Sequence, residues 1–152
     1  MTTQTLLTSI RDALDSDTAL EAWCQAQFSK SATIMLGLDE RNPPAEADYP
    51  LVSIVGCTQA RGDMVRELSW QVFIGVGVVN DTVVFSGSKK TATGLLQAEE
   101  LRELAENAIY RARLATSQTA GEASTEGYYP LFVSYTTFTF TALRNTQRGL
   151  PG

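Results

Sequence analysis

Residues 66–79 carry the clearest pattern in the chain, a strict alternation of apolar positions with polar or small ones. The apolar positions, which share one parity, are Leu68, Trp70, Val72, Ile74, Val76 and Val78. The opposite parity holds Glu67, Ser69, Gln71, Phe73, Gly75 and Gly77. A period of two predicts a β-strand with one buried face, and at about 3.3 Å per residue this strand extends roughly 40 Å. The two glycines predict a bend, or a surface that another segment approaches closely.

Three segments repeat their apolar residues at helical spacing instead. Residues 5–14 place leucines and an isoleucine on one stripe, which predicts an amphipathic helix. The polar residues 16–18 offer N-cap side chains for a second helix, over residues 18–28. The longest helix is expected over residues 96–114. Its glutamates come early and its arginines late, an order that complements the helix macrodipole.

Shorter apolar runs predict further strands over residues 32–38, 51–55 and 83–85, and a last strand begins after Pro130. We interpret the last of the three runs as a short return strand. Polar and small residues predict loops between the elements, over residues 39–48, 56–64, 86–94 and 116–127. We expect the last two loops to be mobile.

The same dipeptide precedes two strands, as Tyr49-Pro50 and as Tyr129-Pro130. Proline is tolerated at the first residue of a strand because its missing N–H costs little there. It also biases the preceding residue towards an extended conformation. We expect both strands to be entered from long loops and to benefit from this defined entry.

The strand after Pro130 changes its apolar parity along its length. Its first half has apolar residues at odd positions and its second half at even positions, namely Leu131, Val133, Tyr135, Phe138, Phe140 and Ala142. A bulge near Thr136-Thr137 would bring both groups to one side of the sheet. A strand that meets two different packing partners is the alternative.

The order of these elements predicts an α+β fold. We expect a mainly antiparallel sheet with a long central hairpin, N-terminal helices and one long helix packed on the sheet. The chain has 152 residues, which suits a single domain. We place that domain at residues 1–143 and expect a flexible C-terminal tail over residues 144–152.

Composition limits the chemistry that the chain can perform. Histidine is absent, which removes the commonest general base and the commonest zinc ligand. The net charge is −5, and the acidic excess lies in the first 50 residues, a poor distribution for gripping duplex DNA. The N-terminus lacks the pattern of a signal peptide. We therefore interpret Cys24 and Cys57 as free, buried thiols, with a disulfide as the alternative.

No motif indicates catalysis, a cofactor or a bound metal, and we assign no residues to such sites. Residues 87–91 resemble the end of a phosphate-binding loop, but Val83 and Ser88 stand where that motif needs its two glycines, so we interpret the segment as solvated. Lys89 and Lys90 leave contact with an acidic partner or a phosphate open. The acidic residues 39–48 do not match the spacing of a calcium loop. Aromatic residues of the last strand lie among threonines, which favours sheet packing over base stacking. The threonines at 136, 137, 139 and 141 predict an exposed polar face that suits a flat contact with a neighbouring subunit.

The order and size of the elements resemble a known family. The helix with "IRDAL", the strand entered at "YPLVSI", the long strand "RELSWQVFIGVGVV", the helix "AEELRELAENAIYRAR" and the final β segment are similar to the tail terminator (tail completion) proteins of long-tailed bacteriophages, lambda type. The resemblance covers residues 4–143. It implies a small α+β structural protein, not an enzyme, that caps the tail tube as a ring, expected to be a hexamer, and presents the surface to which the head docks.

This resemblance implies three partners: further copies of the chain, the tail tube protein and a head-closure or connector protein. DNA would pass through the lumen without specific binding, and the protein would belong to the virion tail, assembled in the host cytoplasm. The positions that we assign to subunit or tube contacts are Arg66, Glu67, Gln71, Phe73, Lys89, Lys90, Thr137 and Thr139.

Two other classes of protein stay open. One is another head–tail connector, head-closure or tube protein, which would differ in ring symmetry and docking partner. The other is a small-molecule-binding or enzyme domain, which predicts a deep apolar cavity beneath the long helix with a buried, perturbed carboxylate.

Overall fold

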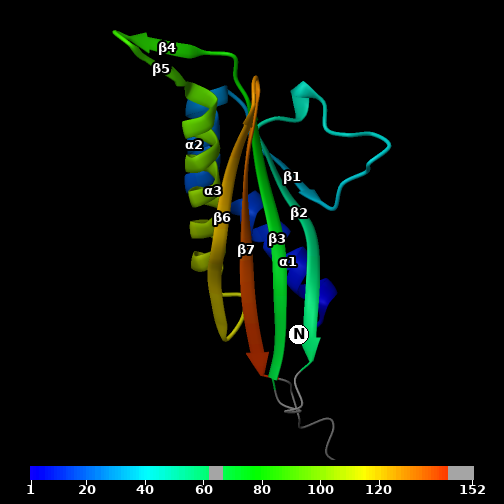
Figure 1. The fold of residues 1–152 in the computed structure, drawn as a ribbon. Coiled ribbons are helices and arrows are strands. Elements are labelled where there is room, and N and C mark those ends of the chain that lie inside the picture. The colour runs from blue at the N-terminus through cyan, green and yellow to red at the C-terminus, as the bar shows by residue number, and fades with distance from the viewer. Residues whose placement is uncertain (62–66, 144–152) are drawn as a thin grey trace, which may run out of the picture.

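The computed structural model describes residues 1–61 and 67–143 (Figure 1). The fold is α+β, as predicted, with helices packed on one face of a five-stranded, mostly antiparallel sheet. The helices are α1 (Thr3–Ser16), α2 (Thr18–Phe28) and α3 (Thr93–Ala112), and a 3₁₀ turn, η1, covers Glu46–Asp48. The strands are β1 (Thr33–Leu36), β2 (Leu51–Arg61), β3 (Glu67–Val79), β4 (Val83–Ser86), β5 (Lys89–Ala92), β6 (Ser117–Tyr128) and β7 (Leu131–Leu143).

Local capping explains where the first two helices begin. The Thr2 side chain accepts a hydrogen bond from the Thr5 N–H at the start of α1, and Asp17 accepts one from the Leu20 N–H at the start of α2. The bounds of α2 match the sequence prediction. The helix α3 begins at Thr93, earlier than predicted, so its first turn holds no acidic residue. The macrodipole interpretation of its glutamates is therefore wrong, because that effect fades beyond the first turn.

The five strands lie in the order β1-β2-β3-β7-β6. The pair β1–β2 is parallel, and every other neighbouring pair in this sheet is antiparallel. The predicted loop over residues 56–64 is wrong as far as Arg61, because β2 continues to that residue as the partner of β3. The rest of that loop and Arg66 lie outside the described residues.

The predicted loop over residues 116–127 is also wrong. Most of it forms β6, which pairs with β7 along nearly its whole length. The connection to β7 is a tight turn at Tyr129-Pro130, so only the Tyr49-Pro50 strand follows a long loop. Both Tyr-Pro peptide bonds are cis.

The apolar parity changes along β7 because the strand meets two different packing partners, which was the alternative to a bulge in the sequence prediction. Register with β3 is continuous from Leu131 to Leu143, so there is no bulge at Thr136-Thr137. Phe138 and Phe140 face the helices and are fully buried. The apolar residues of the first half, such as Val133, face the opposite side and meet the loop of residues 37–50. Thr136 is buried on the helix side, so it does not belong to the predicted exposed threonine face.

Strands β4 and β5 form a hairpin of their own, separate from the main sheet. The return strand predicted over residues 83–85 therefore pairs with β5 and not with the long strand. The predicted mobile loop over residues 86–94 is reduced to a two-residue turn, in which Gly87 adopts a positive φ of 61°. In Figure 1 this hairpin projects from the start of α3, away from the rest of the molecule. We call residues 83–92 the arm.

A single core lies between the helices and the inward face of the sheet. Its largest fully buried side chain is Trp70, whose indole N–H donates to the Thr3 hydroxyl at 2.9 Å. Both cysteines are free thiols, as predicted, although only Cys24 is fully buried and Cys57 is half-buried. None of the described helices has the length and apolar character needed to cross a membrane. The predicted tail, residues 144–152, lies outside the described residues.

Candidate subunit-contact surfaces

The sheet face opposite the helices, here called the helix-free face, holds most of the predicted contact residues. Gln71 on β3 lies directly opposite Thr139 on β7, and Phe73 lies opposite Thr137. These four side chains therefore form one patch. Glu67 lies further along the same face, opposite Leu143 at the end of β7.

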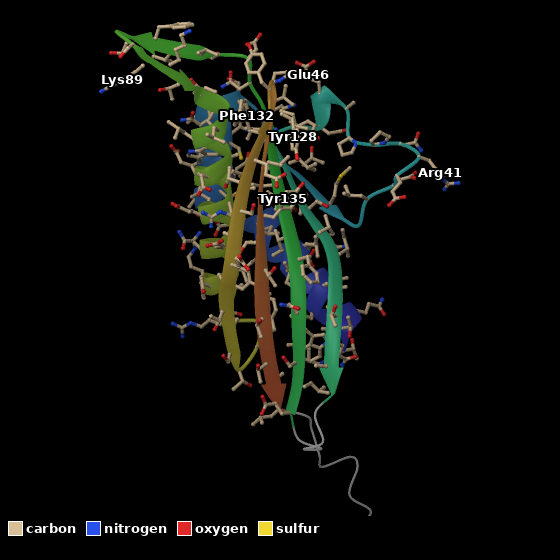
Figure 2. The ribbon with its side chains drawn as sticks, in the orientation of Figure 1. Arg41, Glu46, Lys89, Tyr128, Phe132 and Tyr135 are labelled. Carbon is tan, nitrogen blue, oxygen red and sulfur yellow. The ribbon has the colours of Figure 1, made fainter. Side chains whose placement is uncertain are left out.

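The two predicted lysines do not join this patch. Lys89 and Lys90 lie on the arm, at the far end of the molecule from the start of β3 and the end of β7 (Figure 2). Arg66 lies outside the described residues. The structure thus divides the predicted residues between two surfaces, one on the sheet and one on the arm.

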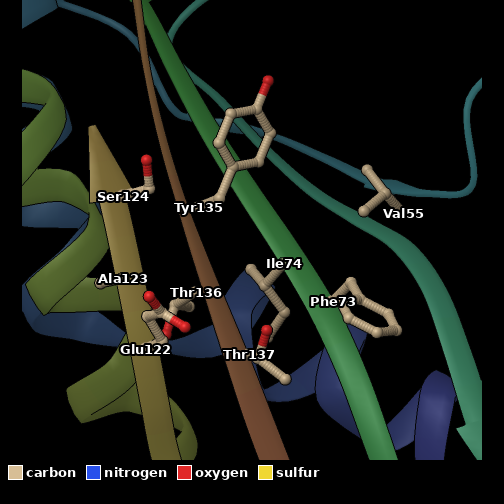
Figure 3. Close-up of a pocket in the computed structure, with 9 residues that line it drawn as sticks. All are labelled: Val55, Phe73, Ile74, Glu122, Ala123, Ser124, Tyr135, Thr136 and Thr137. Carbon is tan, nitrogen blue, oxygen red and sulfur yellow. The ribbon is translucent and has the colours of Figure 1, made fainter. Parts of the chain in front are cut away.

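An open groove lies in the middle of the helix-free face (Figure 3). Its volume is about 430 Å³, and its apolar walls are Val55 on β2, Phe73 on β3 and Tyr135 on β7. These side chains are 42%, 37% and 45% exposed, which is unusual for three neighbouring large apolar groups. Glu122 on β6 adds one carboxylate to the rim. The groove is a candidate contact site for an apolar side chain with a cation beside it.

Sequence reasoning found two of the residues that line the groove, Phe73 and Thr137. Tyr135 could have been found, since it shares parity with the outward-facing half of β7. Val55 could not, because it lies at a register shift between Ile54 and Gly56 that turns it outward. The position of Glu122 likewise depends on a register shift in β6.

The loop of residues 37–50 covers the other end of the helix-free face. A Cβ built on Gly77 would lie 2.7 Å from the Tyr49 ring, so the glycine leaves room for the tyrosine. This confirms the predicted close approach to the long strand. Burial raises the pKa of Tyr49, and the neighbouring Asp48 and Tyr135 add to the shift.

The charged side chains on the helix-free face are acidic. Strands β3, β6 and β7 contain three glutamates, Glu67, Glu122 and Glu126, and no lysine or arginine. Each of the three glutamates is exposed. These three strands therefore offer no cationic side chain to the phosphates of duplex DNA.

The sheet ends in two edges that differ from each other. Strand β6 forms one edge, and β1 together with residues 55–61 of β2 forms the other, where these residues have no outer strand partner in the described chain. Register shifts interrupt both edges at the same level. The shift in β2 lies beside residues 73–74 of β3, and the shift in β6 lies beside residues 136–138 of β7, which pair with residues 72–74 of β3. The Tyr110 hydroxyl accepts the Ala120 N–H at 2.7 Å, which covers one point of the β6 edge.

A network of ionisable side chains joins α3 to the β6–β7 hairpin. Glu99 accepts hydrogen bonds from the Thr125 hydroxyl and from Arg102, the latter at 2.5 Å, and Arg102 also donates to Glu106 at 2.6 Å. The bond from Thr125 is the largest cause that lowers the pKa of Glu99, followed by the bond from Arg102. These residues anchor the hairpin to the helix.

Two further observations bear on small-molecule or metal chemistry. The cavity of about 300 Å³ at the end of α3 is lined by Asp17 and Arg111, which already pair with each other. Within residues 1–61 and 67–143, no three or more Cys, Asp or Glu side chains are grouped to hold a metal ion.

No protein-family model matches the chain, and no curated protein shows significant sequence similarity to it.

Proposed function

We propose that this protein is a structural assembly protein that forms a ring, expected to be a hexamer, at the end of a bacteriophage tail tube and offers a docking surface to the head. The observation that carries the ring is the pair of unlike, open edges of the sheet. The assignment to a bacteriophage tail rests on the resemblance in the order and size of the elements. Native proteins rarely leave long strand edges uncovered, because an open edge recruits further strands. We therefore expect the edge strand β6, which is 12 residues long, to pair with a strand of another chain.

The two edges suit each other in direction. Strand β2 is antiparallel to β3, β3 to β7 and β7 to β6, so β6 runs antiparallel to β2. When β6 of one copy lies beside the opposite edge of the next, the antiparallel sheet continues between copies. Such a contact joins two different surfaces and closes into a ring when the rotation between copies is a simple fraction of a turn.

The charge of the helix-free face supports one orientation of the copies in the ring. Turned inward, β3, β6 and β7 offer the lumen a surface with no cationic side chain. In this orientation Gln71, Phe73, Thr137 and Thr139 line the lumen, and the contacts between copies are made by the sheet edges instead. DNA can then pass without the phosphate contacts that would hold it in place. The helices and the arm lie outside the lumen, where the tail tube protein and a head-closure or connector protein can reach them.

The first experiment is light scattering on a size-exclusion column, followed by negative-stain imaging of the peak. Six copies of the 16.5 kDa chain give a ring of about 99 kDa with a central hole. A different copy number would favour another connector or tube protein. A species that stays monomeric at every concentration would contradict the proposal.

Hydrogen exchange then tests whether the sheet edges form the contact. Backbone N–H groups of β6 and of residues 55–61 are expected to exchange more slowly in the ring than in the monomer. The central strands β3 and β7 serve as the internal control, since both sides of each are already paired. A ring whose edge strands exchange as fast as in the monomer would place the contact elsewhere.

A further inference from the structure

Among the helices and strands that the structure describes, the two strands of the arm make substantial contact only with each other. Isolated two-stranded hairpins are marginal in water, so a partner surface is expected to stabilise this one. Its large apolar side chains face solvent, with Val84 53% exposed and Phe85 66% exposed. The arm is therefore an unpartnered surface with an apolar component.

Hydrogen bonds at its base fix the direction in which the arm projects. The Thr93 N–H donates to the Thr82 carbonyl at 3.1 Å, and the Thr82 N–H donates to the Asn80 side chain at 2.9 Å. Asn80 in turn donates to Gln97 of α3 at 2.8 Å. The arm is thus held to the helix and points away from the sheet, on the β6 side (Figure 1).

The arm carries two positive charges and no negative one. Lys89 and Lys90 have no ion-pair partner among residues 1–61 and 67–143. The ammonium of Lys90 lies 5.7 Å from the centroid of the Phe85 ring, so cation and aromatic ring form one unit. A surface that receives this unit needs carboxylates next to an apolar contact.

The loop of residues 37–50 offers carboxylates next to an apolar contact, and it lies at the opposite edge of the sheet from the arm (Figure 1). It holds four acidic residues and one arginine. The carboxylates of Asp39 and Asp48 are engaged in bonds within the loop, whereas the described residues offer no ion-pair or hydrogen-bond partner to the carboxylates of Glu40 and Glu46. Leu38 is 47% exposed and lines an apolar groove of about 200 Å³.

Contacts at both ends hold this loop in place. The Gly37 N–H donates to the Ile54 carbonyl at 2.8 Å, and the Lys30 ammonium donates to the Ala47 carbonyl at 2.6 Å. The loop can therefore present its carboxylates without first becoming ordered. Figure 2 places Glu46 and Arg41 of the loop on the opposite side of the sheet from Lys89 of the arm, near the same end of the molecule.

We propose that the arm of one copy docks on the loop of residues 37–50 of the next copy. Lys89 and Lys90 face Glu40 and Glu46 of that copy, and Phe85 enters the groove beside its Leu38. This inference rests on the proposed ring, because the continued sheet brings the arm side of one copy to the loop side of its neighbour. Opposite charge on the two surfaces favours this register and disfavours contact between like surfaces.

A charge-swap series tests the contact through the concentration at which the protein is half assembled. The double variant Lys89→Glu/Lys90→Glu is expected to raise this concentration at least about tenfold, because like charges then face each other. Glu40→Lys/Glu46→Lys is expected to have a similar effect. The combination of all four substitutions restores opposite charges and is expected to restore assembly.

The matched control is Arg11→Glu/Arg113→Glu, which changes the net charge by the same amount away from the arm and the loop. It is expected to assemble like the wild type. Circular dichroism and thermal unfolding establish that each variant is folded. Zero-length carboxyl–amine cross-linking of mixed isotope-labelled and unlabelled wild type is expected to join the arm lysines to Glu40 or Glu46 between copies.

The outcomes distinguish failure of the docking inference from failure of the proposed function. A ring that assembles equally well with Lys89→Glu/Lys90→Glu overturns the inference and leaves the ring intact. Assembly that is lost in this variant and not restored by the four-fold swap also overturns it, since the lysines then meet another partner. Wild type that stays monomeric and yields no cross-link between copies overturns both.

Discussion

The carboxylate of Asp17 accepts three hydrogen bonds from the Arg111 guanidinium. One oxygen, Oδ1, accepts from Nη2 at 2.7 Å and from Nε at 3.1 Å, and Oδ2 accepts from Nη2 at 2.8 Å. Oδ2 also accepts the Leu20 N–H at 3.0 Å. One side chain therefore caps the start of α2 and ties it to the last turn of α3. The helices α2 and α3 lie far apart in the sequence. Their contact through Asp17 and Arg111 therefore stabilises the tertiary structure as well as a helix end.

We expect Asp17→Ala to lower the free energy of unfolding by about 1–2 kcal/mol, since it removes the cap and the ion pair together. Asp17→Asn keeps a capping oxygen and is expected to cost less, about 0.5 kcal/mol. Urea unfolding measures both. The exposed Asp15→Ala is the control, expected within about 0.5 kcal/mol of the wild type. Equal losses of unfolding free energy in Asp17→Ala and Asp15→Ala would contradict the role of Asp17 as a helix cap and ion-pair partner.

The close approach of Tyr49 to Gly77 predicts a steric effect. A methyl group at residue 77 would meet the tyrosine ring 2.7 Å away, so we expect Gly77→Ala to cost about 1–3 kcal/mol of unfolding free energy. Gly56→Ala is the matched control in the neighbouring strand, because its nearest atom lies at an ordinary 3.8 Å. Combining Gly77→Ala with Tyr49→Ala removes the clash, so the two losses should not add. Additive losses in thermal unfolding would exclude the contact as the cause.

The lowered pKa of Glu99 predicts how stability depends on pH. A carboxylate whose folded-state pKa lies below its ordinary value of 4.5 stabilises the fold fully above that value. The contribution is lost as the pH falls from 4.5 through the folded-state pKa. We therefore expect acid to destabilise the wild type more steeply than Glu99→Gln, which carries no titrating group at this position.

Urea unfolding of the two proteins at a series of pH values measures this difference. Above pH 4.5 the gap between the two unfolding free energies should be constant, and below it the gap should narrow. Glu103→Gln, at an exposed position of the same helix, is the control and should follow the wild type. Parallel curves for the wild type and Glu99→Gln at all pH values would rule out a lowered pKa of Glu99 in the folded state.

The two thiols are expected to differ in reactivity. Burial is the main cause that raises the pKa of Cys24 to about 11, and the nearby Glu21 adds to it. Burial also raises the pKa of Cys57, but this residue is only half-buried. Because the thiolate is the reactive form, iodoacetamide should modify Cys57 slowly and Cys24 only after unfolding.

Mass spectrometry of the native and the urea-unfolded protein counts the modified thiols. Cys57→Ser should leave the native protein unmodified, and the unfolded variant should take up one label. Rapid labelling of Cys24 in the native Cys57→Ser variant would show that the core around α2 opens more readily than its burial indicates.

Local pattern was sufficient to predict the elements whose apolar residues follow one period. The strand Glu67–Val79 alternates almost without exception, and α2 has both an N-cap residue and a stripe, so its bounds were predicted to the residue. The α+β class follows from these elements and from the long helix, because a sheet with one apolar face needs helices to cover it.

Local pattern was not sufficient where a strand owes its conformation to its neighbour. Residues 117–128 are mostly small and polar and resemble a loop in isolation, yet they form β6 because the N–H and C=O groups of β7 pair with them. Pairing with a neighbour also explains why the end of β2, residues 56–61, was predicted as a loop, since these residues pair with β3. The contact surfaces were predicted only in part, since Gln71 and Thr139 can be assigned to one face by parity, but their pairing depends on register.

The sequence by itself determined which residues avoid water and how often they recur, and therefore most of the helices, the long strand and the exposed side of β3. Only the tertiary structure decided that β4 and β5 leave the sheet as an arm. It also decided that Val55, Phe73 and Tyr135 meet in one groove, and that the arm and the acidic loop lie on opposite sides of the sheet. The physical reason is that periodicity records the burial of single residues, whereas register shifts and strand order depend on backbone hydrogen bonds between segments far apart in the chain.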